Sequence, residues 1–164
     1  PFWEQPVSLW EDNYTVGLRS DYYASRLAAQ IMVRQKSGLI VNLSYYGGRH
    51  YFNNVAYGVN KAAIDRLTTD TALELKPHGV SVISLYPDNV STEGMLAYAA
   101  VTPGFDLSSF ETPRFVGRCV AALANDPAVI DQTGQILITA EIGEKYGLRD
   151  VNGSQPKSQR SELW

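Results

Sequence analysis

Two residues four positions apart, Tyr57 and Lys61, have side chains that could together perform acid–base chemistry. Residues at this spacing share one face of a helix. An ammonium group near a phenol favours the phenolate. One cation at about 4 Å in a half-buried site supplies about the 4 kcal/mol that brings a tyrosine pKa from about 10 to about 7. The pair is therefore sufficient for a general acid at neutral pH, although the spacing alone also fits a plain surface pair.

Ser44 and Pro87 favour the catalytic interpretation because of where they lie. Ser44 comes 13 residues before Tyr57 and Pro87 comes 30 residues after it. Each directly follows an apolar run, residues 39–43 and 80–86, of the kind typical of buried parallel strands. Ligands of open α/β sheets bind at the carboxyl ends of the strands. The sequence therefore predicts that these side chains meet at one edge of a sheet.

The elements that must position these residues alternate along the chain. Apolar periodicity predicts helices over residues 10–34, 55–76 and 112–125, with Asn53 or Asn54 as the cap of the second helix and Gly79 as its end. A third strand is expected over residues 135–139. Helices that alternate with strands are typical of crossover connections on a parallel sheet. Residues 88–109 are expected to be flexible, and residues 152–164 to form a polar tail after a partial domain at 1–151.

Composition bounds the function classes. The chain has 164 residues, 45% of them apolar, which is enough for one packed domain. A net charge of −3 without a basic run gives no electrostatic support for nucleic-acid binding. The single cysteine, Cys119, excludes an intrachain disulfide and is expected in the core, and neither His50 nor His78 has a second ligand at metal-binding spacing. No apolar stretch approaches the 18 residues of a transmembrane helix, and no signal peptide opens the chain.

Three sequence features together resemble a known family. Ser44, the run Tyr-Gly-Val-Asn-Lys at 57–61 and the run Tyr-Pro-Asp-Asn-Val-Ser-Thr at 86–92 resemble the active-site serine, the Tyr-x-x-x-Lys pair and the Pro-Gly-x-Val-x-Thr loop of short-chain dehydrogenases/reductases. The resemblance implies the carboxyl-terminal part of a Rossmann-type doubly wound parallel sheet with three α/β/α layers. About 100 amino-terminal residues are expected to be missing, because such domains have about 250 residues. The absent initiator Met agrees with this expectation of a fragment.

The resemblance also implies an activity and a role for each residue. The expected reaction is NAD(P)-dependent interconversion of a small carbonyl compound and a secondary alcohol, with NADP(H) favoured over NAD(H). Tyr57 would exchange a proton with the substrate oxygen, Lys61 would lower the pKa of Tyr57, and Ser44 would hold the substrate carbonyl. Residues 93–109 would form a substrate lid. The residues expected to hold the cofactor are Tyr57, Lys61, Pro87, Asp88, Val90 and Thr92.

The same resemblance implies a partner for the chain and an alternative to the location expected from the lack of a signal peptide. The two long helices, residues 10–34 and 55–76, are expected to form a homo-oligomer interface. The expected location is cytoplasmic, with association with the endoplasmic reticulum as the alternative. Aromatic residues after Ser44 could form either a substrate wall or ordinary packing. They are Tyr45, Tyr46, Tyr51 and Phe52.

Three departures from the family pattern favour an alternative. Gly17 stands where the family has an Asn that holds a water for proton relay, and Asn13 lies one turn away as a possible substitute. Asp88 stands where a Gly is usual, which predicts backbone strain and a carboxylate without an obvious partner. No Gly-rich dinucleotide-binding fingerprint occurs in the chain. The alternative is a truncated, catalytically silent relative that binds a partner through its long helices.

Overall fold

Three parallel strands form the single sheet of the computed structural model, which describes residues 1–163. The strands are β1 (Gly38–Leu43), β2 (Val80–Tyr86) and β3 (Ile136–Ile138), in the order β1-β2-β3. The β1–β2 register runs from Gly38 opposite Val80 to Leu43 opposite Leu85, and β3 pairs with the last three residues of β2. Every residue of β2 is buried, as expected for the middle strand of a covered sheet. The predicted parallel α/β sheet is confirmed.

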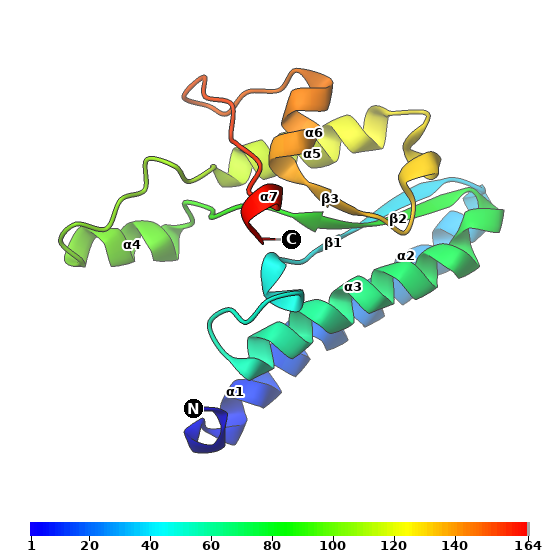
Figure 1. The fold of residues 1–164 in the computed structure, drawn as a ribbon. Coiled ribbons are helices and arrows are strands. Elements are labelled where there is room, and N and C mark those ends of the chain that lie inside the picture. The colour runs from blue at the N-terminus through cyan, green and yellow to red at the C-terminus, as the bar shows by residue number, and fades with distance from the viewer. Residues whose placement is uncertain (164) are drawn as a thin grey trace.

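Helices cover both faces of the sheet (Figure 1). The helices α2 (Ser20–Gln35) and α3 (Val55–Leu75) lie on one face, and α5 (Pro113–Asn125) and α6 (Thr139–Tyr146) lie on the other. Each face has its own apolar cluster because alternate strand residues point to opposite sides. The α2/α3 face buries Ile40, Ala72 and Val82. The α5/α6 face buries Ile83, Leu85, Phe115, Val116, Cys119, Leu123 and Ile142.

The first long helix differs from the prediction of one uninterrupted helix over residues 10–34. It begins earlier, as α1 (Val7–Asp12), passes through a wider π-helical segment (Asn13–Arg19) and continues as α2. Gly17 lies in this segment, and the Ser20 hydroxyl donates to the Gly17 carbonyl at 2.8 Å. A π-helical segment interrupts the regular i→i−4 backbone hydrogen bonds of a helix. A nearby hydroxyl, here that of Ser20, can then donate to a backbone carbonyl of the segment.

The helix that carries Tyr57 and Lys61 is bounded as the sequence predicts. Asn54 caps α3 by accepting a hydrogen bond from the backbone N–H of Tyr57 at 2.9 Å. After α3 a short 3-10 turn (Lys76–His78) leads to Gly79, whose φ of 73° is left-handed and favours glycine.

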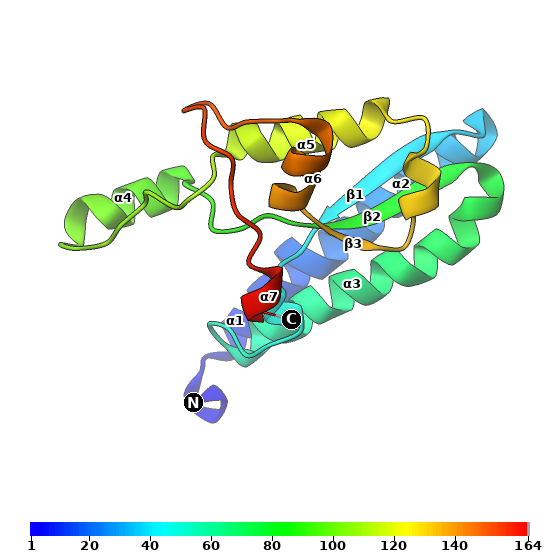
Figure 2. The ribbon, with the colours of Figure 1, turned by 45° about the horizontal axis from the view of Figure 1, so that its top comes forward.

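The fold also contains helices that were not predicted. Residues 88–109, expected to be flexible, contain α4 (Glu93–Val101), which projects away from the sheet in both views (Figures 1 and 2). The third strand is shorter than the predicted 135–139, because Thr139 already begins α6.

The predicted helix over residues 112–125 is found as α5, with Thr112 as its cap.

The predicted polar tail contacts the domain. It includes the short helix α7 (Arg160–Leu163), and the Arg160 guanidinium pairs with the Glu141 carboxylate at 2.8 Å. Gln155 donates to the Ala140 carbonyl at 3.2 Å. Within residues 1–163 no helix is both long and apolar enough to cross a bilayer. The cytoplasmic location stays a prediction.

Candidate active site

Ser44, Tyr57 and Lys61 lie together at the carboxyl end of β1. Ser44 directly follows β1, is 3% exposed, and its hydroxyl donates to the backbone carbonyl of Lys61 at 3.1 Å. The Lys61 ammonium donates to the Leu43 carbonyl at 3.2 Å and lies 5.6 Å from the centre of the Tyr57 ring. The structure therefore brings the three predicted residues together between β1 and the first turns of α3, with the Ser44 hydroxyl on the Lys61 backbone and the Lys61 ammonium beside the Tyr57 ring.

The pKa of Tyr57 is raised, whereas the sequence predicted that Lys61 would lower it. Burial raises this pKa to about 12, and the neighbouring Tyr45 phenol adds to the effect. Burial also lowers the pKa of Lys61, against the opposing influence of the Asp21 and Asp65 carboxylates. The lysine lies over the aromatic ring, and its own ionisation is disfavoured by burial. In this arrangement Tyr57 is therefore a protonated phenol at neutral pH.

Two of the four aromatic residues after Ser44 contact Tyr57. The rings of Phe52 and Tyr45 lie 5.9 and 6.5 Å from it, and the Tyr45 hydroxyl donates to the Asn89 side chain at 3.3 Å. Tyr46 packs on Tyr86 instead. Tyr51 is exposed to solvent. Of the four aromatic residues that could form a substrate wall, only Tyr45 and Phe52 therefore lie beside Tyr57.

Asp65, one helical turn after Lys61, was missed by the sequence reasoning. Its carboxylate accepts hydrogen bonds from the Ser84 hydroxyl at 2.6 Å and from the Tyr86 hydroxyl. It therefore joins α3 to β2 behind the cluster and also stabilises the charge of Lys61. The sequence signal that could have identified Asp65 was its position four residues after Lys61, which places both on one helix face.

Two backbone hydrogen bonds to Glu111 hold the segment at 87–92, and the Val90 N–H takes part in neither of them. The N–H of Ser91 donates to the Glu111 carbonyl at 2.9 Å, and the N–H of Glu111 donates to the Asn89 carbonyl at 3.0 Å. The N–H of Val90 donates to no residue in the described range. Thr92 accepts the cap bond of α4 from the Met95 N–H, so its own hydroxyl proton is not used in that bond.

These groups fit the predicted cofactor segment. A spare backbone N–H at Val90 suits a carboxamide oxygen, and the hydroxyl of Thr92 suits a further polar group. The strain expected at Asp88 is absent, because its φ is not in the left-handed region. The expectation of a carboxylate without a partner is also wrong, since the Asp88 side chain accepts from the Asn89 N–H at 2.7 Å.

Gly17 contacts Asn60, which takes the space that a larger residue at 17 would fill. A Cβ at Gly17 would lie 2.2 Å from Asn60 Nδ2, and Asn60 is 9% exposed with an unpaired Oδ1. Asn13, considered as the substitute for the missing Asn, donates instead to the Leu9 carbonyl at 2.8 Å. The buried amide near this position is therefore that of Asn60.

Residues 1–100 match the family described as short chain dehydrogenase. The chain belongs to the short-chain dehydrogenase/reductase family. It is 43% identical to dehydrogenase/reductase SDR family member 1 of Mus musculus, over 95% of this chain and 53% of that protein. The Homo sapiens protein of the same name is 44% identical, over 93% and 52%. The chain spans about half the length of these curated relatives.

Solved structures of the family have the same fold. An acetoin dehydrogenase from Enterobacter cloacae is 28% identical with a TM-score of 0.69, over 84% of this chain and 56% of that chain. A 3-oxoacyl-[acyl-carrier protein] reductase of Brucella melitensis with bound NAD has a TM-score of 0.66 at 26% identity, over 83% and 52%. A Beutenbergia cavernae protein with bound NADP reaches 0.73 at 28% identity, over 85% and 59%. These similarities confirm the Rossmann-type sheet of short-chain dehydrogenases.

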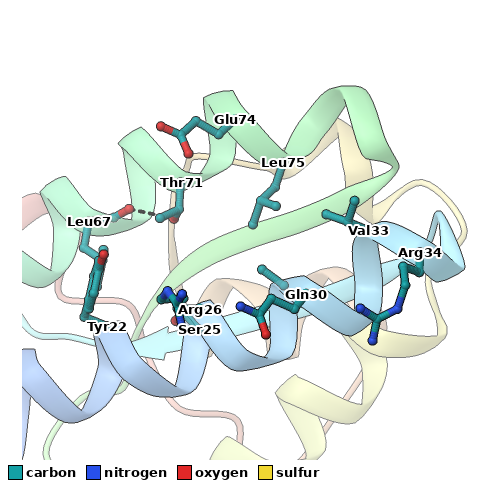
Figure 3. A pocket seen from close by; sticks show the side chains of 11 residues that line it. Tyr22, Ser25, Arg26, Gln30, Val33, Arg34, Leu67, Thr71, Glu74 and Leu75 are labelled. Atoms are coloured by element: carbon teal, nitrogen blue, oxygen red, sulfur yellow. Dashed lines mark hydrogen bonds between the residues drawn. The ribbon is translucent and has the colours of Figure 1, made fainter.

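A cleft lies on another part of this chain, away from Ser44, Tyr57 and Lys61. It has a volume of about 460 Å³ and runs between α2 and α3 (Figure 3). Its lining includes Tyr22, Arg26, Gln30, Leu67 and Glu74. None of the three clustered side chains lines it. The cleft therefore belongs to the helical surface and not to the sheet edge.

Proposed function

We propose that this chain carries the catalytic residues of an NAD(P)-dependent oxidoreductase that interconverts a carbonyl and a secondary alcohol. The observation that carries the proposal is the cluster of Ser44, Tyr57 and Lys61 at the carboxyl end of β1. Parallel sheets bind ligands at this edge. Membership of the short-chain dehydrogenase family supports an oxidoreductase.

Tyr57 acts as the acid in the proposed reaction. A phenol with a pKa of about 12 stays protonated at neutral pH, and this form donates a proton to a carbonyl oxygen during reduction. The Ser44 hydroxyl exchanges its bond to the Lys61 carbonyl for one to the substrate oxygen. Bound NAD(P)H supplies the hydride.

Lys61, Val90 and Thr92 hold the cofactor in this proposal, with NADP(H) favoured over NAD(H). Lys61 would bind the nicotinamide ribose, and the spare N–H of Val90 would donate to the carboxamide. In the lid, the rings of Tyr98 and Phe105 lie 5.0 Å apart. This apolar surface supports a carbonyl substrate with an apolar body.

The experiment compares this chain with a chimera that places the amino-terminal half of the mouse relative before Pro1. NADPH binding is measured by fluorescence, and turnover is measured with a panel of ketones and aldehydes. In the chimera, Tyr57→Phe is expected to lower kcat by about 10²- to 10⁴-fold and to leave NADPH affinity within twofold. Tyr51→Phe, at an exposed phenol, is the matched control. An active chimera that is unaffected by Tyr57→Phe overturns the proposal.

One observation favours a second candidate, a catalytically silent partner-binding chain. The Ser44 hydroxyl is buried and already donates to a carbonyl of α3. A chimera that binds no NADPH and reduces no carbonyl in the same assay favours this candidate.

We also propose that α2 contributes to an interface between copies of this chain. Tyr23, Leu27 and Ile31 follow one another at four-residue spacing and are 52%, 58% and 52% exposed. Residues at this spacing form one apolar stripe along a helix. A stripe that is exposed in one copy supports association with a second copy.

A further inference from the structure

Glu111 is a buried carboxyl group that the proposed reaction does not use. It lies between α4 and α5 and is 1% exposed. Its backbone forms a parallel bridge with Val90, and its carbonyl also accepts from the Ser91 hydroxyl at 3.0 Å. Through these bonds Glu111 holds the segment at 87–92, the segment that would hold the cofactor.

The Glu111 side chain holds the same segment from a second side. The Thr139 hydroxyl oxygen lies 3.0 and 2.8 Å from the two carboxyl oxygens of Glu111 and 3.4 Å from the Tyr86 carbonyl. The backbone N–H of Asp88 also donates to the Glu111 carboxyl group. Since Thr139 has a single hydroxyl proton, it donates to only one of these acceptors at a time.

The groups that face Glu111 do not include a cation in the described structure. Asp88 faces it from the segment after β2, Asp150 from the chain after α6, and the Cys119 thiol from α5. Burial, Asp88 and Asp150 raise the pKa of Glu111 to about 7, against the opposing hydrogen bonds of Thr139 and the Asp88 N–H. The Arg118 guanidinium acts on Asp150.

Two hydrogen-bond arrangements follow. When Glu111 is ionised, Thr139 donates its proton to the carboxylate, and the Tyr86 carbonyl loses that donor. When Glu111 is protonated, its O–H donates to the Thr139 oxygen, and the Thr139 proton turns to the Tyr86 carbonyl. Tyr86 directly precedes Pro87, so the second arrangement adds a hydrogen bond at the start of the segment at 87–92. The bond from the Asp88 N–H becomes a neutral one, and the repulsion between the Glu111 and Asp88 carboxylates ends.

We propose that Glu111 is a positioning residue for the segment at 87–92, and that its protonation strengthens the hold on this segment by turning the Thr139 hydroxyl to the Tyr86 carbonyl. The effect on the segment involves only residues of this chain and does not depend on the proposed function. Only the identity of the segment's ligand, a nicotinamide cofactor, rests on the proposed function.

Hydrogen exchange in the chain itself tests the hold on the segment. Amide protection at residues 88–92, which follow Pro87, is measured at pH 6 and pH 8, relative to β2 and after correction for the intrinsic exchange rate. One neutral hydrogen bond predicts protection about 2- to 10-fold greater at pH 6. Glu111→Gln and Thr139→Val are each expected to abolish this difference, and Glu144→Gln, at an exposed carboxyl group on α6, is expected to preserve it. Protection independent of pH in the unmodified chain, or a difference that persists in Glu111→Gln, overturns the proposal.

NADPH titration of the chimera separates this proposal from the proposed function. The dissociation constant is expected to rise from pH 6 to pH 8 by the same 2- to 10-fold factor, and Glu111→Gln is expected to remove the rise. A constant that does not differ between Glu111→Gln and the unmodified chimera overturns the positioning role toward the cofactor. Failure of every chimera to bind NADPH contradicts the proposed function, while the exchange experiment still decides the role of Glu111.

Discussion

At Tyr57, the order in which two groups lose their protons determines what Lys61 can do. Burial lowers the pKa of Lys61 and raises that of Tyr57 to about 12. Lys61 is therefore already neutral at the pH where the phenol titrates, and a neutral amine does not stabilise a phenolate. A lysine four residues away is thus not sufficient by itself to make the tyrosine acidic.

This order predicts that Lys61→Met leaves the pKa of Tyr57 in the isolated chain near 12. The measurement is a pH titration of ¹³C-labelled tyrosine by NMR, with Tyr57→Phe used to assign the signal. The exposed Tyr51 is the internal reference for an unperturbed phenol. A Tyr57 that titrates near 7 in the unmodified chain, and returns toward 10 in Lys61→Met, would show that the ammonium controls it.

The contact between Gly17 and Asn60 gives a prediction about stability. Gly17→Ala is expected to lower the free energy of unfolding by about 1–3 kcal/mol, because its Cβ would lie 2.2 Å from Asn60 Nδ2 in a packed site. In an Asn60→Ala background the same change is expected to be neutral or stabilising. Urea denaturation of the four variants measures the coupling.

Gly117→Ala is the matched control for that cycle. Gly117 lies within α5, and a Cβ added there would meet nothing within 4 Å, so alanine is expected to stabilise by about 0.5–1 kcal/mol. Equal effects at Gly17 and Gly117 would contradict the contact.

Glu111 predicts how stability depends on pH. Its pKa of about 7 in the folded chain exceeds the ordinary 4.5, so the folded state binds more protons than the unfolded state between these values. The free energy of unfolding is therefore expected to fall by up to about 3 kcal/mol as the pH rises from 4.5 to 7. Glu111→Gln removes this contribution, and denaturation at several pH values compares the slopes. Parallel slopes in the two proteins would refute the assignment.

At the residue level, the sequence could predict Ser44, Tyr57 and Lys61 because their spacing is local and each lies next to a recognisable strand or helix. It could not predict Glu111 or Asn60. Glu111 meets Thr139 from 28 residues away, and Asn60 meets Gly17 across two helices. Contacts of this kind depend on how the helices pack, which a spacing rule does not describe.

Among the elements, α3 depends on its cap for the position of Tyr57. Asn54→Ala is expected to cost about 1 kcal/mol of stability, because the N–H of Tyr57 loses its acceptor at the start of the helix. Faster amide exchange at Tyr57 is expected with it, and Asn54→Ser restores both. Thr112→Ala, which uncaps α5 instead, should leave the exchange at Tyr57 unchanged. Unchanged exchange in Asn54→Ala would contradict the role of the cap.

Long and strongly patterned elements were predictable, and short ones were not. The bounds of β2 and the start of α3 follow from an apolar run, an Asn cap and a Gly end. The helix α6 was missed because it begins at Thr139, directly after β3 ends at Ile138, without an intervening turn. The π-helical segment around Gly17 was missed because apolar periodicity does not separate it from a regular helix.

Over the whole molecule, the exposed face of α2 is an apolar surface that the described part of a single copy leaves uncovered. Tyr23, Leu27 and Ile31 are each more than half exposed, and the cleft between α2 and α3 lies beside the same helix (Figure 3). Apolar side chains in a continuous stripe gain free energy when a second surface covers them. The sheet itself does not supply that cover, since β1 and β2 pack against the opposite face of these helices.

The stripe predicts that the chain self-associates and that a charge at its centre prevents this. Leu27→Glu is expected to shift the protein from dimer to monomer at about 10 µM, because the interface would bury an unpaired carboxylate. Sedimentation velocity measures the mass, and the circular dichroism spectrum of the fold is expected to stay unchanged because Leu27 is 58% exposed in one copy. The thermal midpoint is expected to fall only by the stabilisation that dimer formation adds. Val101→Glu, at a 78% exposed valine at the end of α4, is the control and should keep the dimer. A monomeric unmodified chain, or a Leu27→Glu variant that still dimerises, would remove α2 from the interface.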